Sequence, residues 1–167
     1  MLARIVEGQL FDPPDRARLV VASRCFPTGY LGYWVRKLAE NGLVAALTAT
    51  SPPRLAHPEG GEPLAGTNPL AIAVPSSDGA PLVADVSMGK VTYGDVLLGT
   101  ASPEELVPFG GEQAHKAFAL AVGLQGLVES FVGDSYGIVL VAAKPEFDQF
   151  AAAFRDRAAG LRLPGDA

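Results

Sequence analysis

Residues 51–69, SPPRLAHPEGGEPLAGTNP, constrain the fold more than any other stretch of this chain. Proline and glycine recur there so often that neither a regular helix nor a central strand can pass through. The segment is too long for a simple turn, and loops of this length in compact domains are often functional. The regular elements must therefore form before and after it, and ligand contacts are expected in or beside it.

Short apolar runs alternate with helical patterns on both sides of this loop. Residues 17–23 and 43–50 predict strands, the first of them buried, on either side of a helix over 30–42 that ends at a glycine. After the loop, residues 68–75 and 80–87 predict two strands joined by Ser-Ser-Asp-Gly, a sequence that suits a hairpin turn.

The carboxyl-terminal third continues this alternation. Residues 115–133 are apolar on most sides and predict a buried helix, and residues 136–144 predict a central strand. Residues 145–160 predict a helix with Pro145 in its first turn and Phe147, Phe150 and Phe154 at helical spacing. We expect an α/β fold, a mixed sheet with flanking helices, in one domain over residues 1–167.

Composition excludes several classes of function. The chain has 13 Lys and Arg against 18 Asp and Glu, with no basic cluster suited to nucleic acid. No uncharged apolar stretch is long enough for a membrane span, so a cytoplasmic protein is expected. The single cysteine, Cys25, excludes an internal disulfide and a cysteine-based zinc cluster, and no metal site is expected.

Short motifs give few indications by themselves. No G-x-G-x-x-G dinucleotide fingerprint follows a strand, and Ala84 stands where a P-loop before Gly89-Lys90 needs glycine. Ser87 and Lys90 form an S-x-x-K, but its companion motifs are absent. These observations exclude the usual dinucleotide and P-loop sites and leave a few isolated polar residues as candidates.

Asp85 lies in an apolar strand, where an ionised carboxylate is costly unless hydrogen bonds or a positive charge compensate it. It could cap a helix starting just after it, or it could face a ligand. Thr67 and Asn68 have a similar ambiguity between a plain turn and a cradle for an anionic or amide-bearing ligand.

His115 and Lys116 open a helix, where positive charge opposes the helix dipole. Either both side chains are simply solvated or they contact a phosphate or carboxylate. His57, in the long loop, is expected only to be exposed to solvent.

Taken in order, several segments resemble the type 2 malate/L-lactate dehydrogenase family, the group with ureidoglycolate dehydrogenase, 2,3-diketogulonate reductase and Δ1-piperideine-2-carboxylate reductase. The matching pieces are GYLGYWVRKLAENGLVAALTATSPP, GGEPLAGTNPLAIAVP, PLVADVSMGKVTYG, VPFGG with HKAFALAVGLQGL, YGIVLVAAKPEF and LRLPGD. The resemblance implies a fold other than the doubly wound one, and a homodimer that reduces small 2-oxo or cyclic 2-imino acids with NADH or NADPH.

The resemblance also implies roles for individual residues. Residues Asp85, Val86, Ser87, Lys116, Gly165 and Asp166 fall on the family's cofactor-binding positions, Thr67, Asn68 and Pro69 on its substrate loop, and His115 and Lys116 are the candidate catalytic residues. The family's Ser-His-Gly segment, whose histidine donates the proton, has no counterpart, so the chain resembles a shortened member. A general acid typically contributes about 10²–10⁴-fold.

Three functions remain open at this stage. The first is an NAD(P)H-dependent reductase of a small 2-imino or 2-oxo acid in a specialised biosynthetic pathway. An imine substrate is favoured over a ketone because imines depend less on a proton donor. The second is a non-redox enzyme on the same scaffold, such as a cyclase, isomerase or dehydratase. The third is a non-catalytic ligand-binding or partner subunit.

Overall fold

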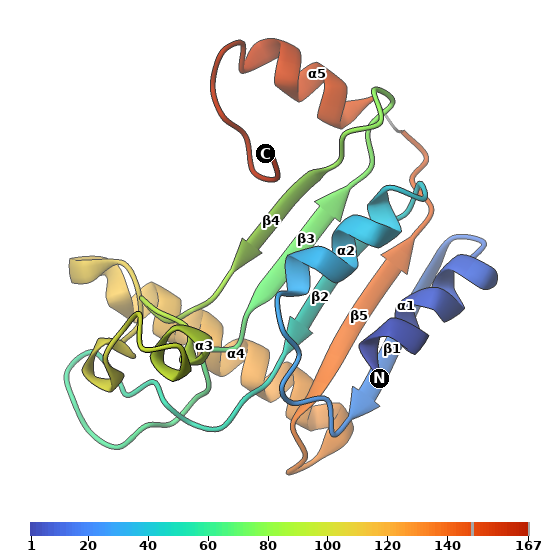
Figure 1. Ribbon diagram of the computed structural model, residues 1–167. Coiled ribbons are helices and arrows are strands. Elements are labelled where there is room, and N and C mark those ends of the chain that lie inside the picture. The colour runs from blue at the N-terminus through green and yellow to red at the C-terminus, as the bar shows by residue number, and fades with distance from the viewer. Residues whose placement is uncertain (148, 167) are drawn as a thin grey trace.

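A computed structural model describes residues 1–147 and 149–166 (Figure 1). Its centre is a five-stranded sheet with the strand order β1-β5-β2-β3-β4. The elements in chain order are α1 (Leu2–Phe11), β1 (Ala17–Ser23), α2 (Leu31–Ala39), β2 (Val44–Ala49), β3 (Leu70–Val74), β4 (Leu82–Val86), α3 (Tyr93–Leu97), the 3-10 turns η1 (Pro103–Glu105) and η2 (Gly111–Gln113), α4 (Ala114–Val132), β5 (Gly137–Ala143) and α5 (Phe150–Arg157).

The α/β class with flanking helices is confirmed, but the strand directions differ from a mixed sheet. All four pairings among the described strands are antiparallel. The unit β1-α2-β2 has the expected strand-helix-strand order, and its two strands run in the same direction. They are not neighbours, because β5 lies between them and pairs with both. Because β5, the last strand in the sequence, lies between β1 and β2, the sheet contains two antiparallel pairs there instead of one parallel pair.

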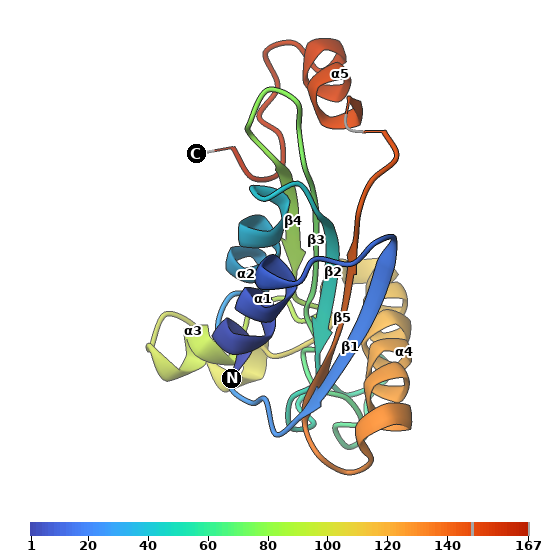
Figure 2. The ribbon, with the colours of Figure 1, turned by 90° about the vertical axis from the view of Figure 1, so that its right-hand side faces the viewer.

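Helices α1 and α2 cover one face of the sheet (Figure 2). Val35 and Leu38 of α2 pack on Ala45 and Leu47 of β2, and all four side chains are fully buried. Burying one such leucine contributes roughly 1.5–3 kcal/mol. Gly42 ends this helical segment with a φ of 81°, a backbone conformation that favours glycine, which confirms the predicted end.

Helix α4 lies on the opposite face of the sheet and covers only part of it (Figure 2). Ala117 and Ala121 are buried there, whereas Leu120 and Phe131 are 52% and 54% exposed. The prediction that this helix is buried is therefore wrong, because only one side of it meets the sheet. The pattern is apolar all round, but the described chain supplies nothing to cover the outer side.

Two other predictions need correction. Strand β1 is an edge strand and is not buried, since Leu19 is 53% exposed and only β5 pairs with it. Helix α5 starts at Phe150 and not at Pro145, and Phe147, which was expected on its apolar face, precedes it and is 83% exposed. The hairpin of β3 and β4 has the predicted position and connection.

Candidate functional site

Asn68 anchors the long loop to helix α4. Its side chain is fully buried, and its oxygen Oδ1 accepts a hydrogen bond from the Ser51 amide at 3.3 Å. Its nitrogen Nδ2 donates to the carbonyl of Ala121 at 2.9 Å and to Oε1 of Gln125 at 2.7 Å. An asparagine can make both kinds of contact because it carries a donor and an acceptor. Both polar atoms are thus bonded within the protein.

The neighbours of Asn68 in the loop are also tightly packed and hydrogen-bonded. A Cβ atom on Gly66 would lie 2.4 Å from both the carbonyl oxygen and Oγ of Ser51, so only glycine fits. Thr67 is buried, and its carbonyl accepts from the amide of Met88 at 2.8 Å. The carbonyl of Pro69 accepts from Oγ1 of Thr48 at 2.9 Å. The three residues predicted to bind substrate therefore hold the loop in place.

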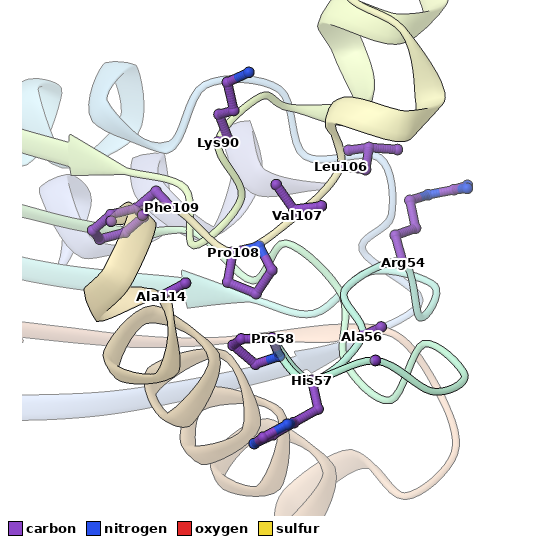
Figure 3. A pocket seen from close by; sticks show the side chains of 13 residues that line it. Arg54, Ala56, His57, Pro58, Lys90, Leu106, Val107, Pro108, Phe109 and Ala114 are labelled. Atoms are coloured by element: carbon purple, nitrogen blue, oxygen red, sulfur yellow. The ribbon is translucent and has the colours of Figure 1, made fainter.

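A pocket of about 740 Å³ opens beside this loop (Figure 3). It lies between the first half of the loop and the segment that leads into α4. Three basic residues contribute to its wall, and none of the described residues that line it is acidic, although the protein has a net charge of −5. The other lining residues are Ala56, Pro58, Gly60, Leu106, Val107, Pro108, Phe109, Gly110, Gly111 and Ala114. An apolar pocket whose charged side chains, Arg54 and Lys90, are both positive suits an anionic ligand.

Backbone hydrogen bonds join the buried loop to this pocket. Beyond the Thr67–Met88 contact, the carbonyl of Met88 accepts from the amide of Phe109 at 3.2 Å. The amide of Lys90 donates to the carbonyl of Val107 at 2.7 Å. Thr67 therefore supports the segments that carry the pocket wall and does not line the pocket itself.

The three basic side chains are Arg54, His57 and Lys90, and their surroundings differ. Nζ of Lys90 lies 2.9 Å from Oε1 of Glu105, and this ammonium group is the largest cause that holds the pKa of Glu105 below its ordinary value. The ring of His57 stands edge-on to Phe118 with 5.2 Å between centroids. The guanidinium of Arg54 lies 3.4 Å above the ring of Tyr93.

Asp85 caps a helix, but not the one expected. Its oxygen Oδ2 accepts a hydrogen bond from the amide of Gly32, in the first turn of α2, at 2.7 Å. The residue is exposed on edge strand β4, so the burial cost argued from its apolar neighbours does not arise. The short helix that follows β4, α3, is capped instead by Thr92 and Asp95, which form a reciprocal capping box.

The other predicted cofactor residues of the carboxyl terminus lie beside Asp85. The amide of Val83 in β4 donates to the carbonyl of Pro164 at 3.1 Å, and Nη2 of Arg36 donates to the carbonyl of Gly165 at 2.7 Å. Gly165 has a φ of 93°, and a Cβ there would lie 2.9 Å from the Val83 amide nitrogen. The structure thus brings Asp85 and Gly165 to the side of β4 that faces α2.

Three further predicted residues take part in local turns or lie exposed. Oδ2 of Asp166 accepts from the amide of Leu163 at 2.7 Å, and Oγ of Ser87 accepts from the amide of Gly89 at 3.2 Å. Val86, the last residue of β4, is 44% exposed. Val86 and Ser87 thus lie at the end of β4, and Asp166 lies in the carboxyl-terminal segment that pairs with Val83 of this strand.

His115 and Lys116 are exposed in the first turn of α4. They directly follow Ala114, which lines the pocket, but neither of them lines it. Helix α4 is on the opposite face of the sheet from α2, which contacts Asp85 (Figure 2). The structure therefore groups the predicted residues into two sets and does not unite them in one cleft.

Sequence reasoning missed Arg54 and Lys90 as pocket residues. His57 is exposed, as predicted, but sequence reasoning did not foresee that it also lines the pocket. The signal that could have found them is their position. Arg54 and His57 stand in the long loop that already suggested function, and Lys90 follows the glycine after β4.

Among residues 1–147 and 149–166, no group of three His, Cys, Asp or Glu side chains is placed to hold a metal ion. Over the same described residues, none of the helices has the length and apolar character that a membrane crossing requires.

Fold and pocket together define an α/β protein with a basic pocket suited to an anionic ligand. A sequence model of the malate/L-lactate dehydrogenase family matches residues 18–106, more than half of the chain. The chain belongs to this family.

Two relatives illustrate the match in sequence. The (2R)-3-sulfolactate dehydrogenase (NADP(+)) of Chromohalobacter salexigens is 41% identical over 78 residues, which cover 47% of this chain and 23% of that protein. The Δ1-pyrroline-2-carboxylate/Δ1-piperideine-2-carboxylate reductase of Pseudomonas aeruginosa is 32% identical over 117 residues, which cover 68% of this chain and 35% of that protein. The matched region thus spans well under half of these curated relatives.

Solved structures agree on the fold. A dehydrogenase from Sinorhizobium meliloti superimposes with a TM-score of 0.76 at 22% identity, covering 98% of this chain and 61% of its own. The Δ1-piperideine-2-carboxylate reductase of Pseudomonas syringae superimposes with a TM-score of 0.64 at 23% identity, covering 82% of this chain and 56% of its own. The family and these relatives are dehydrogenases and reductases.

Proposed function

We propose that this protein is a nicotinamide-dependent reductase of a small 2-imino or 2-oxo acid in a biosynthetic pathway. The observation that carries the proposal is the pocket with Arg54, His57 and Lys90 on its wall and no acidic residue among the described residues that line it. The carboxylate of such a substrate is the kind of group that this wall would attract, and the apolar lining would hold its carbon skeleton. Family membership supports the reaction type.

The residues present fit a nicotinamide cofactor, NADH or NADPH, in part. A dinucleotide carries phosphates, and the pocket offers basic side chains beside the start of α4, where backbone amides favour anions. The exposed Asp85 and the adjoining Gly165 loop support a second contact surface along β4. When bound, the cofactor supplies the hydride.

The protein must also supply a proton, and we assign this role to His115 or Lys116 in the first turn of α4, the helix whose first residue, Ala114, lines the pocket. Both are exposed, so solvent can reprotonate them after each turnover. An imine is basic and can arrive already protonated, which makes a cyclic 2-imino acid the better substrate. A 2-oxo acid depends more on the donor, whose contribution is typically about 10²–10⁴-fold.

Residues 1–167 are proposed to act as a single domain that pairs with a second copy. Leu19, Val141, Ala46, Ile72 and Ala84 form one apolar row across all five strands, and α4 leaves much of it uncovered. The accessible surface of 9553 Å² exceeds the roughly 7,800 Å² of a compact monomer of 17.3 kDa. The difference exceeds the ~800 Å² that each partner buries in a standard interface.

Light scattering after size exclusion tests the pairing. We expect the native chain to elute as a dimer and Ile72→Asp to elute as a monomer, because a charge in the apolar row opposes burial. Phe11→Ser is the matched control, since Phe11 is 92% exposed at the end of α1 on the other face. A native chain that is monomeric at high concentration contradicts this part of the proposal.

The separation of Asp85 from Lys116 favours one second candidate, a non-redox enzyme such as a cyclase, isomerase or dehydratase that uses the same pocket. A non-catalytic subunit that only binds the ligand in this pocket is the third possibility. Either protein would bind the anionic ligand without a nicotinamide cofactor. A measurement of cofactor binding therefore distinguishes both of them from the reductase.

The deciding experiment is calorimetric titration with NADH, NADPH and their oxidised forms, followed by an assay of cofactor absorbance with Δ1-pyrroline-2-carboxylate and with pyruvate. Micromolar binding of a reduced cofactor and its oxidation by the imino acid support the reductase. Binding of the acids without binding of any cofactor supports the non-redox candidate. A chain that binds neither acid nor cofactor contradicts both.

A further inference from the structure

Arg54 has an unusual combination of fixed position and unmet hydrogen-bonding capacity. Its backbone amide and that of Leu55 both donate to the carbonyl of Ala65 at 2.8 Å, and Leu55 is fully buried. The start of the side chain is therefore held by the same loop that Asn68 ties to α4. The guanidinium at the other end lies 3.4 Å above the Tyr93 ring.

The position of Tyr93 is itself fixed by the cap of α3. Tyr93 is the first residue of this helix and follows the cap residue Thr92. Oγ1 of Thr92 accepts from the amide of Asp95 at 3.2 Å, and Oδ2 of Asp95 accepts from the amide of Thr92 at 2.8 Å. The aromatic ring thus stands on a closed turn, and Arg54 is preorganised at both ends.

Three other arginines illustrate the usual case, in which the guanidinium binds an acceptor in the protein. Arg18 pairs with Asp12 at 3.0 Å, Arg155 pairs with Asp78 at 2.8 Å, and Arg36 donates to the Gly165 carbonyl. In Arg54, by contrast, Nε is buried and finds no hydrogen-bond partner among the described residues. An aromatic face compensates charge but accepts no ordinary hydrogen bond, so this donor is left unsatisfied.

The other two basic residues of the pocket are already engaged. Lys90 pairs with Glu105, and Nδ1 of His57 accepts from the amide of Glu59 at 3.2 Å. Arg54 is therefore the basic residue of the pocket whose side chain makes no hydrogen bond or ion pair with another described residue, which leaves its guanidinium available to a ligand. A guanidinium presents its donors as a planar fork that matches two oxygens of a carboxylate or phosphate.

We propose that Arg54 is the oxyanion-binding residue of the pocket and that Tyr93 is the positioning residue that holds its guanidinium. The inference rests on the proposed function for the identity of the ligand. The oxyanion is the carboxylate of a small 2-oxo or 2-imino acid or a phosphate of the nicotinamide cofactor. No bond to carbon forms or breaks at Arg54, which binds and orients.

Calorimetry of the full chain with four probes tests this assignment. The probes are pyruvate, its uncharged amide pyruvamide, NADPH and inorganic phosphate. We expect Arg54→Gln to weaken binding of pyruvate or NADPH at least tenfold, and Arg54→Lys to weaken it less, because lysine keeps the charge but loses the fork. Pyruvamide should bind poorly to every variant if the carboxylate is the group that Arg54 recognises.

Variants of Tyr93 separate positioning from mere structure. Tyr93→Phe keeps the aromatic face and should bind as the native protein does, whereas Tyr93→Ala should lose several-fold in affinity. In the enzyme assay, these losses should raise KM and leave kcat less affected. Arg4→Gln, which removes an exposed arginine from α1, is the charge-matched control and should change neither affinity nor KM.

The outcomes distinguish the two ligand sources and the two proposals. Loss of pyruvate binding alone assigns the carboxylate, and loss of NADPH binding alone assigns the phosphate; both support Arg54. Native-like binding of both ligands by Arg54→Gln overturns the assignment while the proposed function stands. Phosphate binding that requires Arg54, without binding of pyruvate or NADPH, keeps Arg54 and overturns the proposed function. Absence of binding to all four probes overturns both.

Discussion

The two halves of the long loop use polar residues in opposite ways. In the half around Asn68, the amide oxygen and nitrogen are both bonded inside the protein, and the side chain is fully buried. In the half that begins at Arg54, a buried donor has no partner among the described residues and the side chain lines a pocket. A satisfied polar group holds the structure, whereas an unsatisfied one beside a cavity marks a place for a ligand.

Asn68→Ala is expected to have the largest effect on stability. It removes three hydrogen bonds and leaves their buried partners unpaired, so unfolding by urea should show a loss of about 3 kcal/mol. Asn41→Ala, which removes one exposed bond to the Lys37 carbonyl, is the control and should change stability by less than about 0.5 kcal/mol. Comparable losses in the two variants would break the contrast between the loop halves.

Gly66→Ala should follow, because the new methyl group meets Ser51 at 2.4 Å and the loop must shift. The expected loss is about 2 kcal/mol. Gly123→Ala is a matched control, since that glycine is exposed within α4 and no atom lies within 4 Å of its added Cβ. This control should gain up to about 1 kcal/mol through helix propensity. A stable Gly66→Ala protein would show that the loop is less tightly packed than the contacts indicate.

Asp85→Ala tests whether a polar residue outside the loop has a structural or a ligand-binding role. Asp85 is predicted to bind a cofactor, but its side chain caps α2. Loss of this cap should cost about 1 kcal/mol, and Asp85→Asn should restore most of it because asparagine caps equally well. Thermal shifts with and without NADPH measure both roles. If the apo protein is unchanged by Asp85→Ala and only the ligand shift is lost, the residue acts on the cofactor alone.

The smallest expected effect concerns Glu105 and Lys90. The pKa of Glu105 is lowered, first by its hydrogen bond with Lys90, so the ion pair contributes above the ordinary carboxyl pKa and is lost as pH falls through the depressed value. Nuclear magnetic resonance titration below about pH 4 should show this loss. Glu105→Gln should free Lys90 and raise phosphate affinity about twofold at low salt, and an unchanged affinity would remove Lys90 from the ligand wall.

Much of the fold could be predicted from local sequence. The β3-β4 hairpin follows from two apolar runs around Asp-Gly, and the end of the first long helix follows from Gly42, because turn and cap preferences act over a few residues. The family resemblance also depended on segments met in order along the chain, and the family match confirms it.

The candidate site was less predictable because its contacts join distant parts of the chain. Asp85 caps Gly32 across 53 positions, and Asn68 bonds to Gln125 across 57, so neither role is visible in the residues next to it. The exposure of α4 likewise depends on how far the sheet extends beneath it. An apolar pattern predicts which residues avoid water but not which partner is available to cover them.

The sequence by itself determined the α/β class, the hairpin, the irregular loop and the family, since propensity, turn chemistry and motif order are properties of short segments. Only the tertiary structure decided that β5 lies between β1 and β2, that Asn68 is an anchor, and that Arg54, whose buried Nε has no partner among the described residues, lines a pocket. Burial and hydrogen-bond satisfaction depend on every neighbouring segment at once, and these two properties distinguish a structural polar residue from one available to a ligand.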